Sequence, residues 1–394
     1  MLFSILKKIS IKGKIDIVDH KGAVYSFGVK SPYVKIKFHN KLVQKKILLN
    51  PDLYVGEAYM NGELTIEEGS PEDFIYIISS IYDDFLSKNL FQKFTNNFLK
   101  IFRSFQQLNN LIKSKKNVAH HYDLNEKLYK IFLDKDMQYS CGYFFNDNIN
   151  LDQAQIDKKN HIIKKLNIKK NMTVLDIGCG WGGLALHIAK QTGAIVKGIT
   201  LSENQLSVAK KRAEEENLTD KVEFVLQDYR HEKDRYDRIV SVGMFEHVGV
   251  NYYSSFFSNT YNLLKENGVF LLHTIGNQGS ISATNPWIRK YIFPGGYIPS
   301  LSEIIKECEK RRIIITDIEI LRLHYAKTLR HWYQNFLNNR DKIIEMFDEK
   351  FFRMWEFYLL SSEYSFRNMG NVVFQIQICK KMKNLPLTRN YIYN

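Results

Sequence analysis

The sequence has few cysteines and prolines and lacks any long apolar run. Its 394 residues include seven prolines and four cysteines, and the cysteines show neither a paired framework nor metal-ligand spacing. This argues against a disulfide-rich secreted fold and favours a reducing cytosol. No apolar stretch is long enough to span a bilayer, and the first residues, MLFSILKKISIKGK, reverse the order of a signal peptide. We expect a cytoplasmic protein whose contact with a membrane is peripheral.

Acidic side chains are outnumbered by basic ones. Lys and Arg total 56 against 42 Asp and Glu, which gives a formal net charge of +14. Such a charge attracts polyanions or anionic lipid surfaces. A composition rich in Lys, Asn and Ile can also follow from an AT-rich genome, and the excess charge can be spread over the whole surface. Charge alone therefore leaves the partner open.

The length and the pattern of elements predict two domains. Residues 12–38 contain short β-type stretches, and 71–113 carry apolar residues at helical spacing. We expect residues 1–112 to form a small α+β domain with a helical end. The apolar faces of its long helical region must be covered, and packing on the neighbouring domain is favoured over docking on a membrane.

From residue 171 strands and helices alternate, as a doubly wound parallel sheet requires. Residues 325–369 are largely helical. The strand candidates, in chain order, are TVLDIG, AIVKGIT, VEFVLQ, RIVSVG, VFLLHTI, IIITDIEI and VVFQIQICK. We predict that residues 113–394 form an α/β, Rossmann-like domain with a mostly parallel seven-stranded sheet.

Glycines follow the first predicted strand of this sheet. The strand runs into DIGCGWGG and then into a helix, so Gly178, Gly180 and Gly182 let the backbone approach a ligand at the carboxyl end of the sheet. A glycine-rich turn alone is weak evidence for any one nucleotide cofactor. The carboxylate of Asp176 would repel a pyrophosphate but suits the ammonium of a methionine moiety. The turn therefore favours S-adenosylmethionine over a dinucleotide.

The next two strands also end in polar residues. Thr200, Ser202 and Gln205 offer hydroxyl and amide groups where an acidic residue often holds a ribose. After the third strand, Asp228 would accept from an adenine amino group and Tyr229 would stack on the base, although plain packing accounts for Tyr229 equally well. We assign these five residues to cofactor binding.

Five segments, in order along the chain, form a specific set. They are HHYDLNEKLYKIFLDKDMQYSCGYF (120–144), LDIGCGWGGLA (175–185), GITLSENQ (198–205), DRIVSVGMFEHVG (237–249) and HYAKTLRHWYQNF (324–336). This set closely resembles the cyclopropane-fatty-acyl-phospholipid synthases, and the mycolic-acid methyltransferases share many of the segments. GEAYMNGELTIEEG, nearer the amino terminus, is also like the longer bacterial synthases. The resemblance implies a class I methyltransferase fold and transfer of a methylene group from S-adenosylmethionine to the cis double bond of phospholipid acyl chains at a membrane surface.

The resemblance also implies a base. Members of this family methylate the double bond and then remove a proton so that the ring closes, and a bound bicarbonate ion serves as the base. The resemblance places its ligands at Cys141, Glu246, His273, Ile275 and Tyr325, with Cys141 and Ile275 contributing backbone groups. Chemically, His273 and Tyr325 would donate to the ion, and Glu246 would accept its hydroxyl proton.

Several histidine and cysteine positions allow a second interpretation. Cys141 would be an alternative thiolate nucleophile, but no base is adjacent to it in the sequence. His273 lies on an apolar strand, where a hydrogen-bonded core histidine would otherwise be favoured. We interpret His247 as structural because neighbouring helix side chains point apart. His120-His121 look like metal ligands, but no third ligand stands at motif spacing, so we expect no metal.

Two further segments are expected to enclose the ligands. By resemblance, Tyr139-Ser140 would close over the methionine end of the cofactor. The segment NPWIRKYIFPGGYIPS would form a cap over the acyl chain, in which aromatic side chains either line a tunnel or simply pack, while Arg289 and Lys290 would meet a phosphate headgroup. The aromatic residues of this cap are Trp287, Tyr291, Phe293 and Tyr297.

Three functions remain open from the sequence. Glu246, His273 and Tyr325 together favour an enzyme that acts on phospholipid acyl chains. Related methyltransferases add methyl or methylene branches, or methylate small amines. The third alternative, a non-catalytic protein that binds lipid or nucleic acid, is supported only by the basic net charge. The presence of Asp176 and of the glycines in the turn argues against it. We therefore expect no nucleic-acid partner. The sequence allows a homodimer without indicating its interface.

Overall fold

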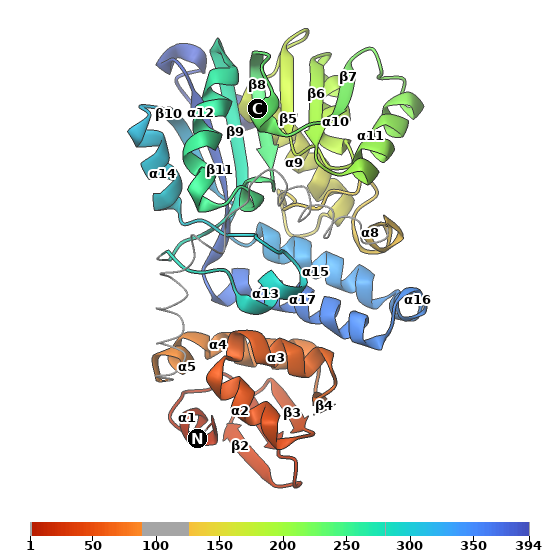
Figure 1. Cartoon of the computed structure of the whole chain (residues 1–394), viewed down its shortest axis with the longest axis vertical. Coiled ribbons are helices and arrows are strands. Elements are labelled where there is room, and N and C mark those ends of the chain that lie inside the picture. The colour runs from red at the N-terminus through yellow and green to blue at the C-terminus, as the bar shows by residue number, and fades with distance from the viewer. Residues whose placement is uncertain (1, 89–125, 280, 394) are drawn as a thin grey trace. The chain divides into compact units, whose positions relative to one another are not determined.

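The structure is a computed structural model that describes residues 2–88, 126–279 and 281–393 (Figure 1). The chain divides into two units, each built from several segments. Unit 1 comprises residues 1–103, 282–294 and 329–370, and unit 2 comprises residues 104–281, 295–328 and 371–394. The predicted domain boundary after residue 112 lies outside the described residues and stays a prediction.

Unit 2 contains the predicted seven-stranded sheet (Figure 1). Its strand order is β10-β11-β9-β8-β5-β6-β7, and β11 runs antiparallel to both of its neighbours while the other pairs are parallel. The strands are β5 (Thr173–Ile177), β6 (Ile195–Thr200), β7 (Val222–Leu226), β8 (Tyr236–Val242), β9 (Leu264–Asn277), β10 (Ile314–Ile320) and β11 (Asn371–Cys379). All seven predicted strands and the mostly parallel sheet are confirmed.

Helices cover both faces of this sheet because its strands are apolar on both faces. On β5, Val174 belongs to one buried cluster and Leu175 to another, and on β9 Leu271 and Leu272 divide in the same way. This alternation is the two-residue period of a strand. One cluster includes side chains of α12 (Tyr253–Leu263) and α14 (Leu301–Lys310), and the other includes side chains of α9 (Leu151–Leu166), α10 (Gly183–Thr192) and α11 (Glu203–Glu215).

Short elements complete unit 2. They are α8 (Glu126–Phe132), the 3-10 turns η1 (Tyr229–His231), η2 (Phe245–His247), η3 (Val250–Tyr252) and η4 (Met382–Asn384), and α18 (Asn390–Tyr393). Helix α15 (His324–Leu337) begins in this unit and continues into the residues of unit 1. The predicted helical character of 325–369 is confirmed.

Unit 1 contains a four-stranded sheet with the order β2-β1-β3-β4. The strands are β1 (Lys14–Val18), β2 (Val24–Gly28), β3 (Tyr33–Phe38) and β4 (Leu64–Glu68). The helices are α1 (Leu2–Leu6), α2 (Lys41–Leu49), α3 (Pro51–Met60), α4 (Pro71–Ser80), α5 (Tyr82–Lys88), α13 (Pro286–Tyr291), α16 (Arg340–Met346) and α17 (Glu349–Asn368). The α+β character predicted for the amino-terminal part is confirmed.

The helical region predicted over 71–113 is interrupted in its described part. Helix α4 starts at a capping box, in which Ser70 and Asp73 exchange hydrogen bonds, and it ends at Ser80, before α5. Phe74 and Ile77 are buried, and α4 packs against β1, β3 and α17 within unit 1. Protein therefore covers this apolar face, and the rest of the predicted helix lies outside the described residues. None of the helices in the described ranges combines the length and apolar character needed to cross a membrane.

Candidate active site

A pocket lies in unit 2 at the carboxyl ends of β5, β6, β7 and β8, where open α/β sheets bind ligands. One wall comes from the segment that precedes α9. The lining residues are Met137–Ser140, Asp176–Trp181, Leu184, Ile199–Leu201, Gln205, Gln227–Arg230, Val242–Met244, His247 and Val248. Most of the predicted cofactor residues are among them, including Tyr139 and Ser140.

The glycine turn after β5 contains two kinds of position. Gly180 has a φ of +56° and lines the pocket, and a Cβ added to it would meet no atom of the described residues within 4 Å. Gly182 has a φ of +85°, but its added Cβ would lie 2.6 Å from Phe224 Cζ. Gly182 is the residue before α10 and does not line the pocket. The structure therefore gives Gly182 a packing position rather than a place against the ligand.

Asp176 is the buried carboxylate of this pocket. Its side chain is 2% exposed, and Oδ2 has no hydrogen-bond partner among the described residues. Burial raises the pKa of Asp176 to about 7, against the opposing effect of the Lys158 charge. An unpartnered buried carboxylate oxygen in a pocket wall fits a cationic ligand group such as an ammonium.

The polar residues after β6 form a local network. Thr200 Oγ1 donates to Gln205 Oε1 at 2.9 Å, and both residues line the pocket. Ser202 accepts from the backbone N–H of Gln205 at 3.2 Å and so caps the first turn of α11. Ser202 does not line the pocket, so its polar side chain is explained by the helix start.

Asp228 and Tyr229 both line the pocket, at the end of β7. Asp228 accepts from the Arg230 guanidinium at 2.8 Å and 2.7 Å, so its carboxylate already has a cationic partner. The Tyr229 ring packs edge-on against Phe256, with 5.4 Å between the ring centroids. Tyr229 therefore both lines the pocket and packs against Phe256.

Glu246 and Ile275 are brought together at the adjoining edge of the sheet. Glu246 lies in η2, and its Oε1 accepts from the Ile275 backbone N–H at 2.7 Å. Its other oxygen, Oε2, is buried without a hydrogen-bond partner among the described residues. Burial raises the pKa of Glu246 to about 7, although the bond from Ile275 opposes this shift. The Ile275 N–H is thus engaged by Glu246.

His273 lies two residues before Ile275 on β9 and is 2% exposed. Burial lowers its pKa to about 3, so the imidazole is neutral near pH 7. Its Nδ1 lies 3.1 Å from Gln375 Nε2 on the neighbouring strand β11. An amide that donates to Nδ1 fixes the ring hydrogen on Nε2, which is then a donor. Sequence reasoning missed Gln375, although a glutamine inside the apolar run VVFQIQICK was a detectable signal.

The segment that follows Cys141 contacts the start of α15, the helix that carries Tyr325. Thr328 accepts from the Gly142 N–H at 3.0 Å, and His324 Nδ1 accepts from the Phe144 N–H at 2.9 Å, so the segment after Cys141 is bound to this helix. Tyr325, in the first turn, is 8% exposed. Burial raises the pKa of the Cys141 thiol far above its ordinary value, which argues against a thiolate nucleophile.

The remaining predicted residues are distributed differently. His247, interpreted as structural, lines the pocket, and burial lowers its pKa to about 4. In the predicted cap, Trp287 and Lys290 belong to unit 1 and Tyr297 to unit 2. Lys290 forms an ion pair with Glu57 at 2.6 Å, which reduces its availability to a headgroup. The acyl tunnel stays a prediction, and His120-His121 lie outside the described residues.

Comparisons with known proteins show the family to which the chain is similar. The family model described as mycolic acid cyclopropane synthetase matches residues 109–376, and a domain of unknown function matches residues 2–90. The cyclopropane-fatty-acyl-phospholipid synthase of Escherichia coli K12 is 36% identical over 354 residues, which are 89% of this chain and 88% of that protein. A probable fatty acid methyltransferase of Pseudomonas putida is 38% identical over 287 residues, or 70% of this chain and 73% of that protein.

A solved structure matches as well. The mycolic acid cyclopropane synthase CmaA1, in complex with S-adenosylhomocysteine (SAH) and CTAB, aligns with a TM-score of 0.63 and 32% identity over 67% of this chain and 97% of that chain. The predicted class I methyltransferase fold is thereby confirmed, since the aligned structure shares it. The chain belongs to the mycolic acid cyclopropane synthetase family and is an S-adenosylmethionine-dependent methyltransferase of the cyclopropane-synthase type.

Proposed function

We propose that the chain converts cis double bonds in phospholipid acyl chains to cyclopropane rings, with S-adenosylmethionine as methyl donor and bicarbonate as base. The observation that carries this proposal is Glu246, a buried carboxylate with one oxygen held by Ile275 and the other unpartnered among the described residues. It lies on the same edge of the sheet as the proposed cofactor pocket, since its neighbour His247 lines that pocket.

The pocket residues fit the methyl donor. Asp176 would hold the methionine ammonium, because its buried Oδ2, unpartnered within the described ranges, needs a cationic partner. Thr200, Gln205, Asp228 and Tyr229 would hold the nucleoside from the ends of β6 and β7. The bound cofactor would supply an electrophilic methyl group. The chain itself orients this group and keeps water away from it.

The residues assigned to the base site would suit an anion with one hydroxyl group. As a carboxylate, Glu246 would accept the hydroxyl proton through Oε2. Neutral His273 would donate through Nε2, the tautomer that the Gln375 amide favours. Tyr325, at the start of α15, would donate through its phenol. Bicarbonate bound there would supply the base that removes a proton from the methylated chain.

The substrate would be reached at a membrane surface. Phospholipid acyl chains lie within bilayers, and the net charge of +14 attracts anionic lipid surfaces. We therefore propose peripheral association with the cytoplasmic face of the membrane. Sedimentation of the protein with anionic but not with neutral vesicles tests this step.

Expression in a bacterium that lacks cyclopropane lipids tests the reaction. We expect fatty acids that are 14 mass units heavier and that have lost a double bond, measured by mass spectrometry before and after bromination. Heavier fatty acids that keep the double bond would indicate a methyl or methylene branch instead. The absence of any new lipid would contradict the proposal.

The variant E246Q tests the role of the carboxylate. It should abolish the product while SAH still binds, because the amide cannot accept the anion's proton as a carboxylate does. E356Q is the matched control, since Glu356 is a buried carboxylate of unit 1 that accepts from Tyr59. Unchanged turnover in E246Q would refute the assigned role.

A further inference from the structure

The segment Asp134–Cys141, here called the strap, contributes Met137–Ser140 to the wall of the pocket. Lys158 of α9 is 0% exposed, and its Nζ donates to Gln138 Oε1 at 2.7 Å and to Ser140 Oγ at 2.8 Å. Gln155, one turn earlier on the same helix, donates to the Ser140 carbonyl at 2.9 Å. Two buried side chains of one helix therefore hold the end of the strap that borders the pocket.

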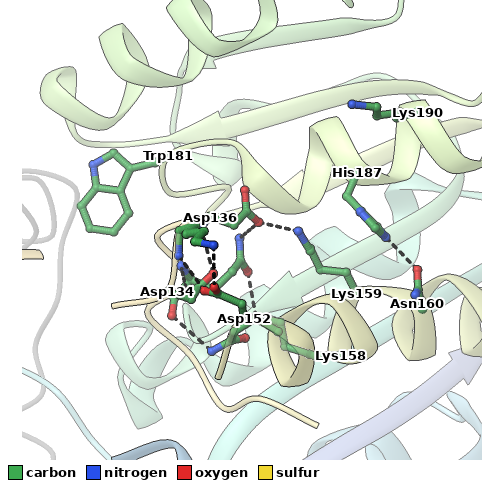
Figure 2. Close-up of polar contacts among 12 residues, drawn as sticks. Asp134, Asp136, Asp152, Lys158, Lys159, Asn160, Trp181, His187 and Lys190 are labelled. Atoms are coloured by element: carbon green, nitrogen blue, oxygen red, sulfur yellow. Dashed lines mark hydrogen bonds and ion pairs between the residues drawn. The ribbon is translucent and has the colours of Figure 1, made fainter. Parts of the chain in front are cut away.

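The other end of the strap has separate anchors. Asp136 forms an ion pair with Lys159 of α9 (Figure 2). It forms a second ion pair with Arg212 of α11. Figure 2 shows Lys158 and Lys159, which are adjacent in sequence, beside the strap residues Asp134 and Asp136. Asp136 does not line the pocket. The two lysines thus act at different ends of the strap, and Lys158 is the one that reaches Ser140.

Lys158 stands behind the pocket wall, because Ser140 lines the pocket and Lys158 does not. A serine hydroxyl that accepts from an ammonium keeps its own hydrogen for donation. The charge behind Ser140 strengthens that donation toward an anionic group. Burial lowers the pKa of Lys158 to about 8, although the Asp134 and Asp136 charges oppose the shift, so the ammonium is mostly charged at pH 7.

The pocket therefore carries charges of both signs. Asp176 offers an unpartnered carboxylate oxygen, and the Lys158–Ser140 pair offers a positively polarised hydroxyl. The amino-acid end of a ligand carries an ammonium and a carboxylate and complements both. We propose that Lys158 is a positioning residue that, acting through Ser140, selects ligands carrying a free amino-acid carboxylate. This inference rests on the proposed cofactor site.

Two ligands separate this role from a structural one. SAH has the amino-acid end, whereas 5′-methylthioadenosine has the same nucleoside without it. In K158M, binding of SAH measured by calorimetry should weaken about 10- to 100-fold, the loss expected for a charge-assisted hydrogen bond. Binding of 5′-methylthioadenosine should stay unchanged. Equal weakening of both ligands, or of neither, would overturn the proposal.

Two more variants complete the test. K165M removes another fully buried lysine of α9, which pairs with Glu319 on β10 and not with the strap, and it should leave both affinities unchanged. S140A removes the hydroxyl group through which Lys158 would act but keeps Lys158 itself. It should weaken the binding of SAH and leave that of 5′-methylthioadenosine unchanged. This variant tests the proposal even if K158M does not fold. If S140A binds SAH as the parent does, the proposal fails. If the parent chain itself does not bind SAH, the proposed cofactor site fails instead.

Discussion

Two glycines of one turn should respond to the same substitution in opposite ways. In G180A and in G182A an alanine takes a left-handed backbone conformation, which costs about 1–2 kcal/mol of folding free energy in each variant. At Gly180 the new methyl group meets no atom within 4 Å in the part of the chain that the structure describes. At Gly182 it would lie 2.6 Å from Phe224 Cζ and 3.0 Å from Ala209 Cβ. Overpacking of a buried site adds about 1–3 kcal/mol.

We therefore expect G182A to be less stable than G180A by that packing contribution, about 1–3 kcal/mol in urea unfolding. The affinity for SAH should follow the opposite order, with a larger loss in G180A than in G182A. Gly180 lines the pocket, so its added methyl group should weaken the binding of SAH by about 1–3 kcal/mol. Folded G182A should bind SAH nearly as the parent protein does. Equal stability of the two variants would refute this reasoning. A greater loss of SAH binding in G182A than in G180A would also refute it.

Three further predictions concern the titration of Glu246, the tautomer of His273 and the ion pairs of Asp136. Burial raises the pKa of Glu246 to about 7, so the fraction of Glu246 that is ionised grows as the pH rises. Turnover at saturating cofactor should therefore rise through about pH 7. A turnover that does not change with pH would exclude Glu246 as the required proton acceptor. Q375L removes the donor to His273 Nδ1 and should lower turnover about tenfold without changing SAH affinity, as steady-state kinetics and calorimetry would reveal. D136N breaks the strap's ion pairs and should lower the unfolding free energy by about 2–4 kcal/mol at pH 7. Those partners hold the pKa of Asp136 below its ordinary value despite burial. The stability lost in D136N should therefore shrink as the pH falls below the ordinary aspartate pKa and through the lowered pKa of Asp136; a loss independent of pH would contradict the ionic explanation.

The fold of unit 2 was largely predictable because its signals are local. Each buried strand is a short apolar run, and the helices between them start and end at capping residues such as Ser202 and Gly193. The division of the chain was harder to predict. Helices α13, α16 and α17 join the amino-terminal sheet in one unit, and this depends on contacts between segments far apart in sequence.

The site was predictable where a backbone motif fixes it. The turn after β5 predicted a ligand site at Asp176 and Gly180, and both residues line the pocket. The pattern could not separate Gly180 from Gly182, because the difference is made by Phe224 on another strand. Lys158 gave no signal, since a lysine in a polar helix normally faces solvent. Its burial became visible only once α9 was placed against the strap.

The position of β11 has a consequence for biosynthesis. This strand lies between β9 and β10, yet it is the last strand of the sheet to be made. While the ribosome is still translating residues 371–379, β9 lacks its neighbour on that side and β10 has no strand to pair with. The nascent chain therefore exposes an open sheet edge until residues 371–379 emerge, and this interval is when chaperones would have to protect it from aggregation.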